Sequence, residues 1–221
     1  MPSLPLQSQL INLFAALLLL LAFAMLTQRR ILSLIRLFAA QGFVLALSTL
    51  VVGYATEQPD LYISAGVTFV LKVVALPWFL HWLIRKLNVQ WDIEAMINIP
   101  VQMLIGIVLV IFAFNLAAPI SEIAGTITRS TLGIAMASIL LSFLMMITRR
   151  KAVSQVIGFL AMENGLFFAA TSATYGMPMV VELGILFDLL VASLIFGVFF
   201  LQIRETFESL DIHHLEKLKE R

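Results

Sequence analysis

The sequence predicts an all-α polytopic membrane protein, with seven transmembrane helices in a single membrane domain spanning residues 1–221. Three observations predict this fold class. First, 61% of the 221 residues are hydrophobic, only 12% are charged and the mean hydropathy is +1.02, whereas about a quarter of a soluble domain's residues are charged. Second, the apolar residues form stretches of about 20, which is the helix length that crosses a ~30 Å hydrocarbon core. Third, basic residues gather in alternate connections.

Short polar or turn-forming segments separate the seven apolar stretches. The stretches are 8–27, 31–54, 61–84, 97–117, 129–148, 152–175 and 179–203. The first stretch is not expected to be a cleaved signal peptide. No basic residue precedes it, and Arg29-Arg30 follow it at once without a small-residue cleavage site.

The basic residues of the connections predict the orientation of the chain. The connections on one side, with the tail, carry Arg29, Arg30, Arg85, Lys86, Arg149, Arg150, Lys151, Arg204, Lys217, Lys219 and Arg221. The connections on the other side carry Arg129 alone. This bias predicts an outside N-terminus and a cytoplasmic C-terminus. The charged tail 204–221 is expected at the cytoplasmic surface, either against a partner or lipid, or as a solvated end.

Two segments of the chain share a pattern that indicates an internal repeat. Arg29-Arg30 precede the second stretch and Arg149-Arg150 precede the sixth. Gln41-Gly42-Phe43 and Glu163-Asn164-Gly165 follow them at similar distances. We interpret this as a parallel duplication of a three-helix unit, 1–94 and 126–203, joined by a connector helix in 95–125. The alternative is that any two apolar hairpins look alike.

Several kinds of reaction and ligand binding are excluded because the chain lacks the residues that they require. There is no cysteine, which excludes disulfides, thiolate catalysis and iron–sulfur ligation. The three histidines do not stand in a metal-ligand pattern, and no phosphate-binding loop or nucleophile elbow occurs. The composition also argues against nucleic-acid binding. We therefore expect no catalytic residue, metal or cofactor in this chain.

Charged residues inside the apolar stretches are the candidates for function. Lys72, Glu163 and Asp188 each lie ten to twelve residues from the polar end of their stretch. A rise of ~1.5 Å per residue places all three roughly 15–18 Å deep, near the bilayer midplane. Gln41 reaches a similar depth, and Glu182 lies about one turn inside the outer end of the seventh stretch. A lone charge at such depth costs about 2.5–3.5 kcal/mol, so these residues are expected to face the protein interior.

Two readings of these midplane charges stay open. They can pass protons between them, or Lys72 and a carboxylate can form a static bridge that fixes helix packing. His81, nine residues beyond Lys72, is a candidate for passing a proton toward the cytoplasm or an interfacial residue beside tryptophans. Arg36 lies only roughly 9 Å deep and is interpreted as an interface anchor. Pro77 is expected to kink the third helix.

The chain resembles a known family of membrane subunits. The stretch 157–165, with Met162-Glu163-Asn164-Gly165, resembles the glutamate-bearing helix of the complex I subunit NuoK and of its Mrp antiporter relative MrpC. A fuller resemblance is to HyfE, component E of hydrogenase-4 in group 4 nickel–iron (NiFe) hydrogenases and formate hydrogenlyases. Its further features are Val181-Glu182 with Asp188, the tail 210–215, and a lysine and proline like Lys72 and Pro77. The resemblance covers the whole chain and is most specific from 149 to 219.

This resemblance implies a non-catalytic subunit of an oxidoreductase complex in a bacterial or archaeal cytoplasmic membrane. Its neighbours would be antiporter-like and NuoH-like membrane chains, with a hydrophilic hydrogenase arm on the cytoplasmic loops and tail. The NiFe centre and iron–sulfur clusters would lie in partner subunits. Glu163 would match the membrane glutamate of NuoK, and Asp188 would stand about one turn from its second glutamate. Gln41, which cannot titrate, occupies the glutamate position of the first repeat.

Three functions remain as hypotheses at this point. The first is a proton-translocating subunit, with Glu163, Lys72, Asp188, Glu182 and His81 as the relay. The second is a scaffold subunit in which buried charges only fix packing and docking. The third is a free-standing secondary transporter. The residues do not distinguish H⁺ from Na⁺ coupling, identify the redox partner or decide whether a proton crosses the membrane through this chain.

Overall fold

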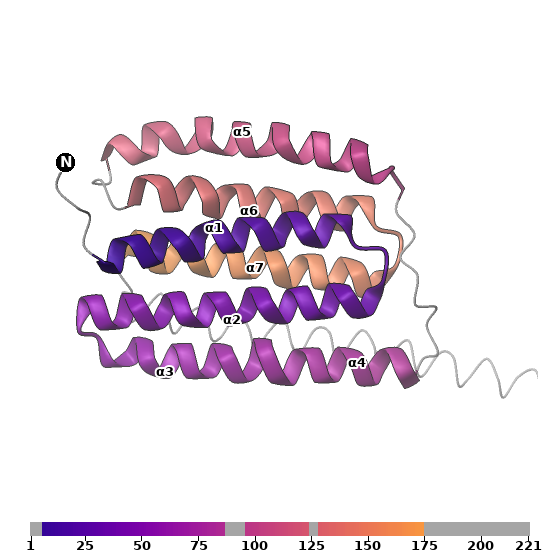
Figure 1. The fold of residues 1–221 in the computed structure, drawn as a ribbon, viewed down its shortest axis with the longest axis horizontal. Coiled ribbons are helices and arrows are strands. Elements are labelled where there is room, and N and C mark those ends of the chain that lie inside the picture. The colour runs from indigo at the N-terminus through magenta and orange to yellow at the C-terminus, as the bar shows by residue number, and fades with distance from the viewer. Residues whose placement is uncertain (1–5, 87–95, 124–127, 175–221) are drawn as a thin grey trace, which may run out of the picture. The chain divides into compact units, whose positions relative to one another are not determined.

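A computed structural model describes residues 6–86, 96–123 and 128–174 (Figure 1). Within these residues every regular element is a helix, and six helical segments are long and apolar enough to cross a membrane. These segments are Leu6–Thr27, Ile31–Thr56, Pro59–Arg85, Ile99–Pro119, Thr131–Thr148 and Val153–Thr171. They coincide with the first six predicted stretches to within a few residues. The seventh, 179–203, lies outside the described residues, so that span and the internal duplication stay predictions.

The helices follow one another with short connections. They are α1 (Leu6–Thr27), α2 (Ile31–Thr56), α3 (Pro59–Thr68), the π-helix η1 (Phe69–Ala75), α4 (Leu76–Lys86), α5 (Ile99–Ile123), α6 (Thr128–Thr148) and α7 (Ala152–Thr174). The segments α3, η1 and α4 continue directly into one another and together form the third span.

The turn between α2 and α3 is closed by local backbone geometry. Glu57 ends α2 in the left-handed conformation, with φ of 55°, and its N–H donates to the carbonyl of Gly53. Pro59 then stands in the first turn of α3, where a missing N–H costs nothing. A Cβ on Gly53 would lie 3.0 Å from the Cβ of Leu61, so glycine permits the two helices to approach closely here. The turn therefore sets α2 and α3 side by side and antiparallel.

Helix α2 lies at the centre of the packing that positions the candidate site. It packs against α1, α3, η1, α4 and α7, while α6 packs against α1, α5 and α7 (Figure 1). A buried apolar cluster joins α1, α2, α6 and α7; its members are Ala15, Leu18, Val44, Leu45, Ala135, Phe167 and Phe168. Much of α5 is exposed, including Leu104, Ile107 and Ile111. Residues exposed and apolar on such a helix suit contact with lipid.

Arg149 is buried at the end of α6, although its sequence position suggests a solvated charge in a connection. The side chain is 1% exposed, and one guanidinium nitrogen donates to the carbonyls of Met25 (3.3 Å) and Leu26 (2.7 Å). These carbonyls belong to the last turn of α1, whose backbone acceptors lack helical donors and carry partial negative charge. Burial lowers the pKa of the Arg149 guanidinium below its ordinary value, because desolvation penalises the charged form. Arg149 thus ties the end of α6 to the end of α1.

Candidate functional site

Lys72 is presented to the interior by the π-helix η1. Within η1 the N–H of Leu76 donates to the carbonyl of Leu71, five residues back rather than four. Pro77 follows directly. Because proline has no N–H, it cannot continue the α-helical hydrogen bonds, and this explains why the winding of the helix changes here. Where a kink was predicted from Pro77, the structure has a seven-residue π-helix just before the proline, and a bend of the helix axis stays a prediction. Such π-turns occur frequently at functional sites.

Lys72 forms a buried ion pair with Glu163 of α7. The Lys72 Nζ lies 3.1 Å from Glu163 Oε1, and the two side chains are 1% and 5% exposed. The partners are 91 positions apart in the sequence, so the pair joins the third span to the sixth. The Lys72 ammonium also lies 5.8 Å from the ring centroid of Phe167, one turn beyond Glu163, in cation–π geometry. The cation thus meets a carboxylate and an aromatic face of the same helix.

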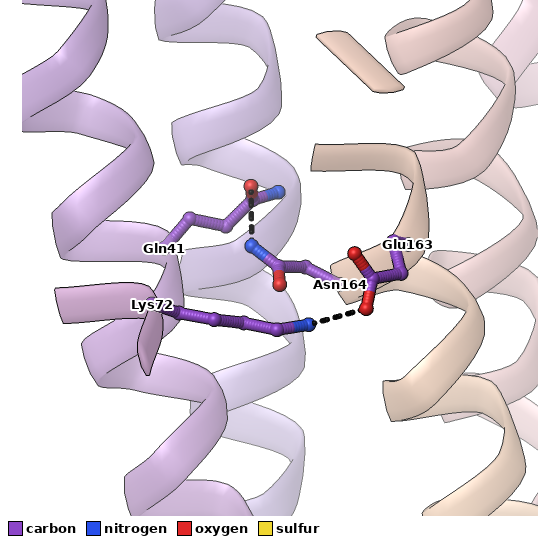
Figure 2. A network of polar contacts seen from close by, with 4 residues as sticks. All are labelled: Gln41, Lys72, Glu163 and Asn164. Carbon is purple, nitrogen blue, oxygen red and sulfur yellow. Dashed lines mark hydrogen bonds and ion pairs between the residues drawn. The ribbon is translucent and has the colours of Figure 1, made fainter. Parts of the chain in front are cut away.

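A second polar contact lies beside the ion pair. The side-chain amide of Asn164 donates to Gln41 Oε1 at 3.2 Å, and both residues are fully buried. Figure 2 shows Gln41 and Lys72 reaching from one side toward Glu163 and Asn164 on the other. We call Gln41, Lys72, Glu163 and Asn164 the polar tetrad. It links α2 and η1 to α7 through two neighbouring contacts, Lys72 with Glu163 and Gln41 with Asn164.

Close helix contact holds Lys72 against α2. A Cβ on Gly42 would lie 2.9 Å from the Cβ of Lys72 and 3.4 Å from its carbonyl oxygen. Only a residue without a side chain allows this approach, because real Cβ contacts are essentially never so short. Gly42 stands next to Gln41, so the same turn of α2 supplies the close contact and one member of the polar tetrad.

Three polar atoms of the polar tetrad are buried without a hydrogen-bond partner among the described residues. They are Gln41 Nε2, Glu163 Oε2 and Asn164 Oδ1. One is a donor and two are acceptors when Glu163 is ionised. Buried polar groups ordinarily find partners in protein or water, since an unsatisfied one costs about 1–3 kcal/mol. The tetrad can therefore accept further hydrogen bonds, and one oxygen of Glu163 can receive a proton while the other contacts Lys72.

The structure brings together some of the predicted site residues and not others. Lys72 and Glu163 meet, whereas His81 lies half-buried on α4 and is not a member of the polar tetrad. Glu182 and Asp188 lie outside the described residues. Arg36 is exposed on α2, which agrees with its interpretation as an interface anchor. The described residues contain no cluster of three histidine or acidic side chains that could hold a metal ion.

Sequence reasoning recognised Gln41 and Asn164 only by their positions, not as partners. The sequence singles out Gln41 by its depth and its place in the first repeat, and Asn164 by its place beside Glu163, without predicting a contact between them. Their contact follows from the packing of α2 against α7, which joins residues 123 positions apart. The available signal was that both are amides at the same predicted depth as Lys72 and Glu163.

Sequence comparison places the chain among known proteins. It is 32% identical over 209 residues to the uncharacterized protein Rv0085 of Mycobacterium tuberculosis, a match covering 94% of this chain and 95% of that one. The chain belongs to the family of this mycobacterial protein.

The distant relatives carry the name hydrogenase-4 component E. The chain is 26% identical over 184 residues to the proteins of that name from Escherichia coli strain K12 and Shigella flexneri, covering 82% of this chain and 84% of each relative. This homology supports the resemblance to HyfE, while a relation to NuoK and MrpC stays a prediction. No family model and no solved structure matches the chain.

Proposed function

We propose that the chain is a multi-pass membrane subunit of a group 4 NiFe hydrogenase-like or formate hydrogenlyase-like assembly. Two findings support this proposal. The described residues contain six helices of membrane-spanning length and apolarity, and the chain aligns with hydrogenase-4 component E over most of its length. On this account the chain carries no redox cofactor of its own. The NiFe centre and iron–sulfur clusters belong to partner subunits, and the chain contacts antiporter-like and NuoH-like membrane subunits.

Within that assembly we propose that Glu163 and Lys72 form part of a proton path coupled to redox chemistry. The buried ion pair carries this proposal, because it sets groups of opposite charge 3.1 Å apart deep inside a membrane-spanning bundle. Ionisable residues inside membranes are rare and mark proton relays and ion pathways. When Glu163 takes up a proton, the attraction between its carboxylate and the Lys72 ammonium is lost. Loss of that proton restores the pair.

We propose that Glu182 and Asp188 continue this path on the following span and that His81 links it toward the cytoplasm. The position of His81 on α4, nine residues or about two and a half turns from Lys72, supports this role. The predicted orientation, with the N-terminus outside, sets His81 on the cytoplasmic half. The charged tail 204–221 and the basic connections are then the surfaces that face the hydrophilic arm.

A scaffold role is the second candidate, and the same ion pair favours it. Because Lys72 and Glu163 join the third span to the sixth, the pair also serves helix packing. A scaffold role predicts that the Lys72→Met variant loses assembly with no separate effect on coupling. A relay role predicts that Glu163→Gln, which keeps shape and hydrogen bonding but cannot ionise, assembles normally and is poorly coupled. An assembled but uncoupled variant therefore excludes the pure scaffold.

Membership of the complex is tested by purification of the tagged chain from native membranes in mild detergent. The eluate is analysed by mass spectrometry and assayed for hydrogen evolution. We expect co-elution with a NiFe large subunit, iron–sulfur proteins and antiporter-like chains. Elution of the chain alone or as a homo-oligomer would overturn the proposal and favour a stand-alone ion transporter.

A further inference from the structure

Buried hydroxyl side chains of α2 and α3 gather on one side of the polar tetrad, toward the α2–α3 turn. Ser48 and Thr49 of α2 are 2% and 1% exposed, and Ser64 and Thr68 of α3 are 0% and 2% exposed. All four lie on the stretch of chain between the tetrad and the α2–α3 turn at Glu57 and Gln58. We call these four residues the hydroxyl seam.

Two glycine contacts fix the register of the helices that carry the hydroxyl seam. Gly42 approaches Lys72, and Gly53 approaches Leu61, with Cβ distances of 2.9 Å and 3.0 Å. The two contacts are eleven residues apart on α2 (53 − 42) and eleven on the facing segment (72 − 61), so the helices keep one antiparallel register over roughly 16 Å. In that register the hydroxyls of α2 and of α3 share the same stretch of the interface. They lead from Lys72 toward the α2–α3 turn.

The hydroxyl seam has capacity for further hydrogen bonds. Ser64 Oγ is buried and has no hydrogen-bond partner among the described residues, as is also true of Gln41 Nε2 and Glu163 Oε2 in the polar tetrad. Thr49 Oγ1 donates to the carbonyl of Leu45 at 3.0 Å, which leaves the lone pairs of its oxygen to accept. Polar, unsatisfied interior sites of this kind are where buried water binds. The tetrad and the seam thus place buried donors and acceptors at successive positions along the chain from Glu163 and Lys72 toward the α2–α3 turn.

On the opposite side of the polar tetrad, the described parts of α2 and α4 bury only apolar side chains. These are Ile31, Leu34, Ile35 and Phe38 on α2, and Leu76, Leu80, Leu83 and Ile84 on α4. Buried polar residues on that side lie on other helices and are Gln102 of α5, Ser142 and Thr148 of α6, and Ser154 of α7. The pair of segments that carries Lys72 and Gln41 is thus lined by hydroxyls toward the α2–α3 turn and by apolar side chains away from it.

We infer that the polar tetrad exchanges protons through the hydroxyl seam with the side of the membrane on which the α2–α3 turn lies. The inference deepens the proposed function and rests on it. Protonated Glu163 releases its proton from Oε2 to a water molecule in the seam, and the carboxylate formed pairs again with Lys72. Each water or hydroxyl then accepts one proton and passes another on, until a proton reaches bulk water at the turn. The predicted orientation makes that side the outside.

Hydroxyl residues also allow close packing of membrane helices, which gives the hydroxyl seam a second reading. Under that reading the seam is dry and serves α2 and α3 only as a contact surface. The two readings differ in one measurable property, which is the access of small aqueous ions to the buried positions. Sidedness of access therefore decides between them.

The chain contains no cysteine, so single thiols can be introduced without removing native ones. Ser64→Cys and Ser48→Cys replace a buried hydroxyl by a thiol of similar size. Each variant, as full-length chain in membrane vesicles of known orientation, is exposed to silver ion on one side only. The reagent is small, membrane-impermeant and binds thiolates. Protection from later alkylation by N-ethylmaleimide, after denaturation, is read by intact-mass spectrometry.

Matched variants supply the controls. Asp60→Cys, exposed beside the α2–α3 turn, reports the compartment at that end, and Arg150→Cys, exposed beyond α6, reports the other. Ser142→Cys is a serine-to-cysteine change at a site that is 3% exposed, whose hydroxyl donates within α6 to the carbonyl of Ser138 at 2.9 Å. It reports non-specific penetration of silver into the bundle. Only variants that elute as the wild type does on gel filtration are compared.

The expected result is protection of Ser64→Cys and Ser48→Cys by silver on the side that protects Asp60→Cys, and loss of protection when silver is on the other side. Ser142→Cys stays unprotected throughout. Absence of protection at both seam positions, protection from the Arg150 side, or equal protection of Ser142→Cys would each overturn the inference. A protected seam in a chain whose Glu163→Gln variant retains full proton yield would instead refute the proposed function, so the two failures are separable.

Discussion

Removing the charge of Lys72 is expected to destabilise the chain strongly, because Glu163 is then buried without its cation. The perturbation is Lys72→Met, which keeps the length of the side chain and removes the ammonium. The side chains of the pair are 1% and 5% exposed, so solvent cannot replace the lost partner. Breaking a buried ion pair by removing one member costs about 3–5 kcal/mol. We expect a loss of that size in the free energy of unfolding.

A double-mutant cycle isolates the contribution of the pair. In the Lys72→Met/Glu163→Leu variant neither charge remains, and apolar replacements of a buried pair are often neutral or stabilising. The double variant is therefore expected to recover most of the stability that each single variant loses. Arg36→Met serves as the control, because Arg36 is an exposed cation on α2 and its loss is expected to cost within about 0.5 kcal/mol.

The assay is unfolding of the purified chain in bicelles by increasing mole fraction of sodium dodecyl sulfate. Circular dichroism follows loss of helix, and the fluorescence of the three tryptophans, which include the exposed Trp78 and Trp82 of α4, follows the change in their surroundings. The reasoning fails if Lys72→Met costs less than about 1 kcal/mol and the cycle shows no coupling, since contacting groups in one network couple by about 0.5–3 kcal/mol or more. Such a result would mean that Lys72 and Glu163 are not paired in a water-poor interior.

Two further predictions follow from close contacts in the described residues. Gly42→Ala is expected to lower stability by about 1–3 kcal/mol, because the added Cβ would lie 2.9 Å from the Cβ of Lys72, whereas Gly66→Ala meets nothing within 4 Å and should be neutral or stabilising. Comparison of the two unfolding midpoints checks this, and equal midpoints would contradict it. Arg149→Met should lose about 2–3 kcal/mol, because it leaves the carbonyls of Met25 and Leu26 without their charged donor. Exposed Arg150→Met is its control, and equal effects of the two variants would refute the capping role of Arg149.

The spans were predictable because their determinants are local. A helix that crosses a bilayer needs about 20 apolar residues in one run, and the bounds of such a run can be read directly from the chain. Six of the seven predicted stretches are helices in the described residues, including 31–54 and 152–175. That Lys72 and Glu163 reach the same level of the bundle was predictable for the same reason, since each residue advances a helix by a fixed rise.

The partners of each site residue were not predictable, because depth is only one of three coordinates. Which helices neighbour each other depends on packing across the whole bundle, and this decides that Gln41 meets Asn164 and that Lys72 meets Glu163. The sequence left open which carboxylate would pair with Lys72. Pro77 predicted a distortion of the third helix, but it did not predict that the distortion would be a π-helix.

Arg149 shows how a sequence rule can hide a structural role. The prediction of orientation counts every arginine of a connection alike. In the structure, Arg149 is buried against the end of α1, whereas the neighbouring Arg150 is exposed. The difference arises because the carbonyls at the end of α1 need donors, and a long planar guanidinium can reach them. The sequence around Arg149-Arg150 does not indicate which of the two arginines donates to these carbonyls.

The central claim is that Glu163 moves protons within an assembled redox complex. It is tested most directly by the proton yield of Glu163→Gln in inverted membrane vesicles, measured as acidification per hydrogen evolved, with the subunit content of the complex checked by mass spectrometry. We predict normal assembly and hydrogen evolution with a clearly lower proton yield. An unchanged proton yield in a fully assembled Glu163→Gln complex would contradict the account.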